Sequence, residues 1–276
     1  MAKSFEYIIK PQKGISLNLK EIWDYRELFY FFTWRDIKVK YKQTALGFLW
    51  AVLQPFLTMI IFTVFFGKML KVPSDGIPYP IFAYSGLIIW NVFASGLSNA
   101  GNSMVSNANI IKKIYFPRLI IPMSAILVAL FDFLMAFVVY IGLMLYFDMP
   151  FHFVKLIVLI PSSLLLTTIT VFGMGSFLAA LNVKYRDFRY IIPFLVQSLL
   201  FLTPVIYPVS IIKYDWAKYV IAINPMSSAV NLMRGAIIDK PIETNMLIIS
   251  CVSAIILFFV GLLYFRKTER YFADIA

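Results

Sequence analysis

The feature that most constrains this chain is a series of six long, unbroken apolar runs. Crossing a hydrocarbon core of about 30 Å takes about 20 mostly apolar residues in a helix, and in lipid a helix satisfies its own backbone hydrogen bonds. The runs are continuous, so they lack the alternation of a transmembrane β-barrel. The sequence therefore predicts an all-α integral membrane protein. Its six transmembrane helices are expected near residues 46–68, 81–104, 119–147, 154–181, 189–207 and 246–265.

Basic residues predict the orientation of these spans. Of the 25 Lys and Arg residues, 18 lie before the first run, between the second and third, at the junction of the fourth and fifth, or after the sixth. The positive-inside rule then places both termini in the cytoplasm. The formal net charge of +11 is read as this orientation signal, and no nucleic-acid partner is expected because no soluble basic domain is found. Without repeats or linkers, residues 1–276 form one domain.

Two further segments predict short helices. Residues 19–44 place Trp23, Tyr30, Trp34, Ile37 and Tyr41 at helical spacing, with cations on another face, which is typical of an amphipathic helix in the membrane interface. The connection 208–245 is too apolar for a mobile loop. We expect two short helices there on the outer side, broken at Asn224-Pro225 and partly dipping into the outer leaflet.

The chain offers few residues for covalent chemistry. The one Gly-Lys pair, Gly67-Lys68, lacks the glycine and hydroxyl residue that a Walker A loop needs, so ATP binding of that kind is excluded. His152 is the single histidine, and its position in a short connection predicts an interfacial role. No metal site and no catalytic residues are predicted.

Asp132 is the one ionisable residue deep in an expected span. Charges inside membranes are costly and therefore count as functional candidates. Two interpretations stay open: a structural acid bonded to a neighbouring helix or shielded near water, and a participant in a transport pathway.

Aromatic and amide side chains recur together on the first and fifth runs. Sugar rings stack their apolar faces on aromatic rings, and their hydroxyls bond to amides, so such a mixture suits a passage for glycans. The alternative is that these positions are ordinary lipid-facing or core aromatics. The channel candidates are Trp50, Gln54, Phe62 and Phe65 on the first run and Tyr190, Phe194, Gln197, Phe201 and Tyr207 on the fifth.

The inward loop 105–118 combines helix-capping residues, cations and an apolar strip, and it breaks at Pro117. The strip consists of Ile110, Ile111, Ile114 and Tyr115. An apolar ridge facing the cytoplasm favours docking into a partner, because exposed apolar patches usually mark interfaces. A helix lying on the membrane surface is the alternative.

Several stretches resemble one known family. They are Trp34 to Pro55, Lys112 to Arg118, Asn182 to Arg189 and Thr203 to Pro208, and the likeness covers most of the chain. In these segments the sequence resembles the permease subunits of ABC-2 type exporters for lipid-linked polysaccharides, with the strongest likeness to O-antigen exporters.

The resemblance implies a homodimeric permease in the bacterial inner membrane that binds two copies of a cytoplasmic ABC ATPase. ATP and Mg would be bound by that partner, and this chain would hold no cofactor. A coupling helix at 107–117 would receive the partner's movement, and the first and fifth spans would line the channel. The coupling residues would be Asn109, Ile111, Lys112, Lys113, Tyr115, Pro117 and Arg118.

The interface helix would flank a lateral opening for the lipid-linked end. Its cations Arg35, Lys38, Lys40 and Lys42 could hold the lipid pyrophosphate by charge-assisted hydrogen bonds. Anchoring of the helix to headgroups is the alternative for the same four residues.

The function expected on this basis is export of an undecaprenyl-diphosphate-linked polysaccharide, O-antigen above all, by the transmembrane subunit of an ATP-driven exporter. Three rivals stay open. The first is an ABC-2 permease for teichoic acid, capsule or small molecules. The second is a membrane enzyme acting on lipid-linked sugars, and the third is an ion-coupled secondary transporter.

Overall fold

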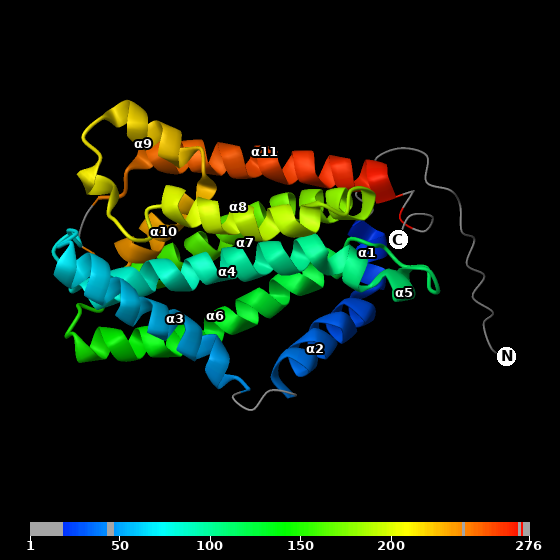
Figure 1. Cartoon of the computed structure of the whole chain (residues 1–276), viewed down its shortest axis with the longest axis horizontal. Helices are drawn as coiled ribbons and strands as arrows, with labels where there is room; N and C mark the ends of the chain where they lie inside the picture. Colours follow the sequence, from blue (N-terminus) through cyan, green and yellow to red (C-terminus); the bar gives the residue numbers. More distant parts are fainter. Residues whose placement is uncertain (1–18, 43–46, 239–240, 270–271, 273–276) are drawn as a thin grey trace.

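In the computed structural model, long helices lie side by side along one axis (Figure 1). The structure describes residues 19–42, 47–238, 241–269 and 272, and these residues contain helices and connections but no strand. The longer helices are α2 (Arg26–Lys42), α3 (Leu49–Phe62), α4 (Tyr79–Ser106), α6 (Ile120–Tyr146), α7 (Phe153–Lys184), α8 (Phe188–Leu202), α10 (Pro225–Gly235) and α11 (Thr244–Thr268). The shorter ones are α1 (Leu19–Asp24), α5 (Ala108–Ile111) and α9 (Asp215–Ala222), together with a 3-10 turn at Val209–Ile211.

Among the described residues, five helices are long and apolar enough to cross a membrane, and they coincide with five of the six expected runs. The first of them is α3 continued by a π-helical segment, Thr63–Met69. The expected run 189–207 differs, because α8 has 15 residues and ends at Leu202. Pro204 explains this end, since the residue before a proline avoids the helical region, and Thr203 has φ −94° and ψ 138°.

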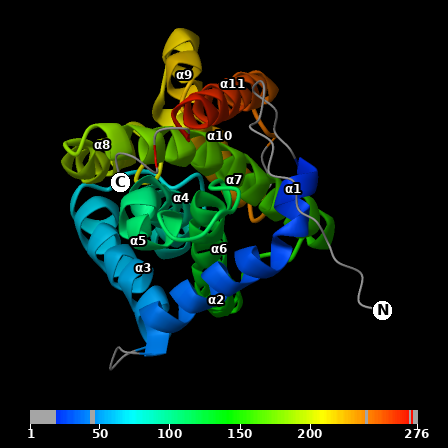
Figure 2. The ribbon, with the colours of Figure 1, turned by 90° about the vertical axis from the view of Figure 1, so that its right-hand side faces the viewer.

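Helix α4 is the central element of the bundle (Figure 2). In the most apolar 18-residue stretch of α4, 78% of the residues are buried. The helix contacts α3, α6, α7, α8 and α10. Glycines permit close contact on two sides. A Cβ at Gly96 would lie 2.9 Å from Val171 Cγ1 on α7, and one at Gly101 would lie 2.7 Å from Ile192 Cδ1 on α8.

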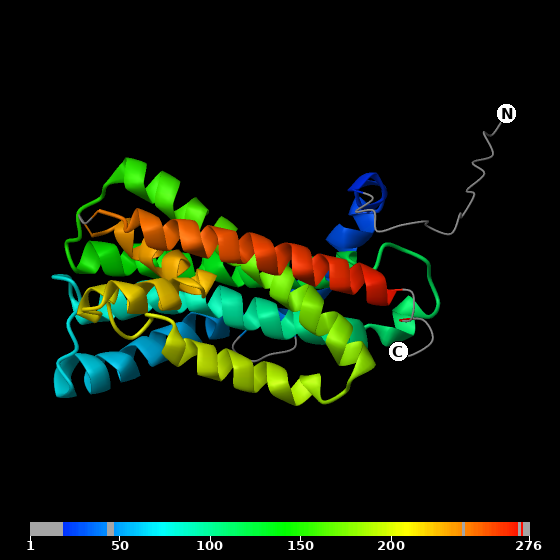
Figure 3. The same ribbon diagram turned by 90° about the horizontal axis from the view of Figure 1, so that it is seen from above.

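The two short helices expected in 208–245 are present as α9 and α10. The Asn224 side chain caps α10 by accepting a hydrogen bond from the Met226 backbone N–H at 3.1 Å, and Pro225 occupies the first helical position. α10 contacts α4, α7 and α11, and Ala229 and Val230 are fully buried. Both short helices lie at the end of the bundle opposite α1 and α5 (Figures 1 and 3).

The segment 19–42 forms α1 and α2, and α2 crosses α6 (Figure 2). Its aromatic stripe is divided rather than uniformly exposed. Tyr30 and Trp34 are exposed, but Ile37 and Tyr41 are buried. The Tyr41 ring stacks on Phe48 with centroids 4.4 Å apart and lies 6.0 Å from Phe131 of α6. The second half of the stripe therefore packs on protein, contrary to the expected single lipid-facing row.

Helices α7 and α11 approach each other closely at a pair of glycines. A Cβ at Gly261 would lie 1.9 Å from the carbonyl oxygen of Gly173, and one at Gly173 would lie 2.6 Å from backbone atoms of Leu257 and Phe258. Backbone cannot yield as a flexible side chain can, so both positions require glycine. Small residues serve this purpose widely between membrane helices.

We predict that Gly261→Ala forces α7 and α11 apart and destabilises the protein by about 1–3 kcal/mol, the usual cost of overpacking. Gly142→Ala is the matched control, since Gly142 lies within α6 with nothing within 4 Å of its Cβ position. It should be neutral or slightly stabilising, because alanine favours helix. Thermal unfolding of the two variants in mild detergent checks the difference, and equal melting temperatures would contradict the observed contact.

Candidate functional site

Asp132 of α6 is bonded to α2. Its carboxylate accepts hydrogen bonds from the Tyr41 hydroxyl and from Lys40 Nζ, with which it also forms an ion pair. The Asp132 side chain is 17% exposed and that of Lys40 is 38% exposed. Burial, followed by the nearby carboxylate, raises the pKa of the Tyr41 hydroxyl, so this group stays protonated and continues to donate. Of the two interpretations of Asp132, the bond to a neighbouring helix is observed.

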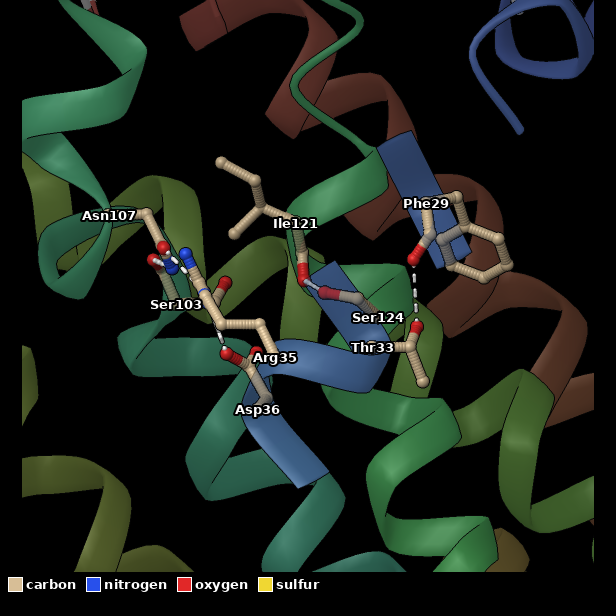
Figure 4. Close-up of polar contacts among 8 residues, drawn as sticks. All are labelled: Phe29, Thr33, Arg35, Asp36, Ser103, Asn107, Ile121 and Ser124. Carbon is tan, nitrogen blue, oxygen red and sulfur yellow. Dashed lines mark hydrogen bonds and ion pairs between the residues drawn. The ribbon is translucent and has the colours of Figure 1, made fainter. Parts of the chain in front are cut away.

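Arg35 makes the second polar contact of α2 (Figure 4). Its Nε donates to Asp36 Oδ1 at 2.8 Å, and its Nη2 donates to Asn107 Oδ1 at 2.8 Å. The Asn107 amide nitrogen in turn donates to the Ser103 carbonyl oxygen at 2.8 Å. Asn107 directly follows α4, so Arg35 ties α2 to the start of the 107–118 loop.

The four cations expected on one headgroup-facing side have different surroundings. Arg35 and Lys40 are directed at acceptors within the protein. Lys38 is exposed, with Nζ 5.2 Å from the centre of the Trp34 ring, and Lys42 is exposed as well. A part for any of them in binding pyrophosphate stays a prediction, and Lys38 and Lys42 are the two whose charges face outward.

The loop after α4 is helical over a single turn, α5, and not over the whole of the expected range 107–117. Pro117 accounts only for the end of that range, since it disfavours helix at Phe116. The expected apolar strip is split, because Ile111 is 5% exposed while Ile114 and Tyr115 are 58% and 56% exposed. Of the seven coupling candidates, four are exposed: Asn109, Lys112, Lys113 and Tyr115.

The other coupling candidates fix the base of the loop. Ile111 and Phe116 join a buried cluster with Phe32, Phe265 and Phe272. Pro117 is buried, and Arg118 donates through its backbone N–H and its Nη1 to Glu269, which follows α11. An exposed tip therefore stands on a base that contacts both α2 and the end of α11.

The channel candidates lie on α3, on its π-helical continuation, on α8 and in the segment that follows α8. Helices α3 and α8 occupy the same side of the bundle, on either side of α4 (Figures 2 and 3). The span formed by α3 and its π-helical continuation is the least buried of the five long spans, because only 11% of its most apolar 18-residue stretch is buried. The exposed candidates are Trp50, Gln54, Phe65, Tyr190, Phe194, Gln197 and Phe201, whereas Phe62 and Tyr207 are partly buried. Most of the aromatic and amide side chains thus reach a surface that the described part of the chain leaves uncovered.

Two cavities open beside α4. One, of about 280 Å³, lies among α2, α3, α4, α6 and α8 and is lined by Lys40, Trp50, Gln54 and Asp132. The other, of about 810 Å³, adjoins Arg35 and the polar residues near the end of α4. Sequence reasoning did not identify α4 as a wall of these cavities. A signal was present, because polar residues recur at helical spacing in its apolar run: Asn91, Ser95, Ser98, Asn99 and Asn102.

A family model described as the ABC-2 type transporter matches residues 27–238. The chain belongs to this family. The match includes α2, every polar contact of α2 with α6 and Asn107, and the exposed loop. An ABC-2 protein of this kind is the membrane subunit of a transporter.

Named relatives cover nearly the whole ABC-2 chain. It is 31% identical over 243 residues to an O-antigen export system permease protein of Klebsiella pneumoniae, covering 87% of this chain and 92% of the relative. A protein with the same name from Myxococcus xanthus is 27% identical over 259 residues, 92% of this chain and 97% of the relative. The polysialic acid transport protein KpsM of Escherichia coli is 26% identical over 248 residues, 86% and 91% respectively.

A buried arginine is the second feature that sequence reasoning missed in this ABC-2 chain. Arg234 of α10 lies in the connection 208–245, where the sequence predicts only outward-side helices, yet this residue is 3% exposed. It donates to the carbonyl oxygens of Pro204 and Val205 at 2.5 Å each and more weakly to those of Tyr207 and Phe82, over whose ring it also lies. The sequence did offer one signal, the pair Pro204 and Pro208. Proline has no backbone N–H, so carbonyl groups near these two residues need a donor from elsewhere.

We predict that Lys40 and Asp132 are energetically coupled. In a double-mutant cycle of Lys40→Met and Asp132→Asn, the coupling should be about 1 kcal/mol, because the pair is only partly buried. Asp132→Leu should cost more than Asp132→Asn, since leucine also loses the acceptor for Tyr41. Melting temperatures in mild detergent measure both effects. Lys42→Met is the control and should change little, and strict additivity of the cycle would contradict the ion pair.

We also predict that Arg234→Lys destabilises this protein. A lysine ammonium cannot reproduce the planar fork that serves several carbonyls, and each buried acceptor left unpaired costs about 1–3 kcal/mol. Arg234→Met should cost more still, while Lys213→Met, at an exposed position near α9, should be neutral. Yield and melting temperature of the purified chains are the readouts. A fully stable Arg234→Met protein would show that these carbonyls need no donor.

Proposed function

We propose that this chain is the membrane subunit of an ATP-driven exporter that moves an undecaprenyl-diphosphate-linked polysaccharide, most of all O-antigen, across the bacterial inner membrane. Two copies would form the membrane part, with α8 as the sixth span of each copy and both termini in the cytoplasm. Two copies of a separate ABC ATPase would bind ATP and Mg. The observation that carries the proposal is the near full-length similarity to permeases named for O-antigen export.

The exposed loop tip supports a docking site for the ATPase. Lys112, Lys113, Ile114 and Tyr115 stand out from the bundle, and the loop base is fixed to α2 and to the end of α11. Because its base is fixed, the loop can transmit a displacement of the bound partner to the helix bundle without itself changing conformation. Positive charge on the tip suits an acidic groove on the partner.

The surface formed by α3 and α8 supports a shared path for the polymer. Large aromatics such as Phe65, Phe194 and Phe201 are exposed there together with Gln54 and Gln197. A second copy placed against this side would enclose the two surfaces, and rings with amides could pass sugars without binding them tightly. α2 would flank the lateral opening, with Lys38 and Lys42 at headgroup depth.

Capsular polysaccharide is the second candidate load. The similarity to KpsM, a polysialic acid transport protein, favours it, although identity is lower than for the O-antigen relative of Klebsiella pneumoniae. Both candidates share one machine, a permease driven by a separate ATPase. They differ in the polymer that the cell supplies.

We predict that the tagged chain, purified in mild detergent, carries with it a subunit with Walker motifs, identified by mass spectrometry. Lys112→Glu with Lys113→Glu should lower this recovery and the polymer-stimulated ATPase activity at least tenfold, because charge on the tip is reversed. Tyr115→Ala should lower coupling of hydrolysis to transport. Lys213→Glu makes the same kind of charge change at the opposite end of the bundle and should leave both readouts unchanged.

Recovery of the chain without any ATPase would overturn the proposal and restore the membrane enzyme or the ion-coupled transporter. Export should also continue in vesicles whose ion gradients have been collapsed, provided that ATP is present. Dependence on the gradient instead would decide for the ion-coupled transporter.

A further inference from the structure

One side of α4 carries a row of amide and hydroxyl side chains. Asn91, Ser95, Ser98, Asn99 and Asn102 recur every three or four residues and so share a face of the helix. We call these five residues the α4 polar row. Although α4 is the most buried of the spanning helices in the described part of the chain, four of these side chains are only half-buried and Asn99 is exposed. At the depth of a spanning helix, a polar group without a partner is costly. Such a row needs partners.

The protein supplies only some of those partners. Ser95 Oγ donates to the Asn91 backbone carbonyl oxygen at 2.7 Å. Asn102 Nδ2 donates to the Ser98 backbone carbonyl oxygen at 2.8 Å, and Asn102 Oδ1 accepts from Asn182 Nδ2 at 3.0 Å. Within the described part of the chain, the side chains of Asn91, Ser98 and Asn99 have no hydrogen-bond partner. Two amides and a hydroxyl therefore remain available.

The row opens into space of ligand size. The cavity of about 280 Å³ reaches Asn91, Ser95 and Ser98, and the one of about 810 Å³ reaches Ser95, Asn99 and Asn102. Both touch Ser95 and Lys40, so they adjoin each other along the row. The larger volume lies within the range of about 300–1,000 Å³ that is usual for ligand sites.

The chemistry of the walls selects a neutral ligand rich in hydroxyl groups. The charges at these cavities are already compensated, since Lys40 pairs with Asp132 and Arg35 pairs with Asp36 at 2.7 Å. A free anion would have to compete with those carboxylates. Amides both donate and accept, as sugar hydroxyls do, and Trp50 adds an aromatic face on the wall of the smaller cavity.

We infer that the α4 polar row is a carbohydrate-binding surface that holds sugar units of the exported polymer in the two adjoining cavities, the smaller bordered by α2, α3, α6 and α8 and the larger by α2, α5 and α6. This inference rests on the proposed function and adds a third wall to the path expected from the first and fifth runs alone. The exposed aromatics of α3 and α8 would contact ring faces, while Asn91, Ser98 and Asn99 exchange hydrogen bonds with hydroxyl groups.

Cysteine accessibility tests the surface directly. In a Cys251→Ser background, which removes the single native cysteine, Asn91→Cys and Asn99→Cys are each introduced into the exporter reconstituted with its ATPase. The control is Leu134→Cys. Leu134 is 54% exposed on α6, and the 3.6 Å distance from Ala129 to the Cβ position of Gly96 places it at about the depth of Asn91. The probe is the undecaprenyl-diphosphate-linked polymer isolated from the producing cells.

A charged, water-soluble thiol reagent should label Asn91→Cys and Asn99→Cys, and the polymer with ATP should slow this labelling at least tenfold. The reagent should fail to label Leu134→Cys with or without the polymer, because this side chain lies outside both cavities and is exposed at a depth where a spanning helix faces lipid. Asn99→Leu should lower export at least fivefold while ATP hydrolysis continues. If this variant folds poorly, the labelling result alone decides the inference.

Labelling that the polymer does not slow would overturn the inference, as would two cysteines that never react because protein covers the face. In either case export by the unsubstituted protein would leave the proposed function standing. An exporter that hydrolyses ATP but moves no lipid-linked polymer would refute the proposed function itself, whatever the cysteines show.

Discussion

The rest of the structure depends on one constraint: within lipid, each backbone carbonyl and N–H group must find its partner inside the protein. Long helices meet it unaided, and α8 does not, because Pro204 and Pro208 end it early and leave carbonyls without donors. Arg234 supplies those donors from α10. The short span and the buried arginine are therefore one feature. The same contacts hold α10 among the long helices, which accounts for a short helix that is almost entirely buried.

The central position of α4 follows from its different faces. The glycine positions bring Gly96 against α7 and Gly101 against α8 on two sides of the helix, where the absence of a side chain allows close packing. Another face carries the polar row beside cavities that apolar side chains could have filled. Filling them would have stabilised the bundle, since apolar contact is favourable and unpaired amides are not. The retention of amides on the best-packed helix is the physical reason to look for a function there.

Much of the fold could be predicted from the sequence. Continuous apolar runs located five long helices to within a few residues, and Asn224-Pro225 located the boundary between α9 and α10. What the sequence could not provide was the partner of each face. Helical spacing correctly grouped Trp34 with Tyr41, yet only the position of α6 decides that Tyr41 is buried and Trp34 exposed. Lys40 and Asp132 lie 92 residues apart, so no local pattern could pair them. The strip containing Ile111 and Ile114 was divided for the same reason, since α2 and α11 cover the base of the loop.

Helix α2 connects the exposed loop to the membrane region by two separate bonds. Arg35 holds Asn107, where the loop begins, and Lys40 with Tyr41 holds Asp132 on α6, the helix into which the loop leads. The two cations are five residues apart, about 7.5 Å along a helix. A helical segment that short is stiff, so a displacement of the loop must either carry α2 with it or break a charge-assisted hydrogen bond. The cavities beside the α4 polar row are lined by these same cations, Arg35 and Lys40. A movement of the loop would therefore change the shape of those cavities, and in the proposed exporter an ATPase bound to the tip would have a direct mechanical route to the space beside α4.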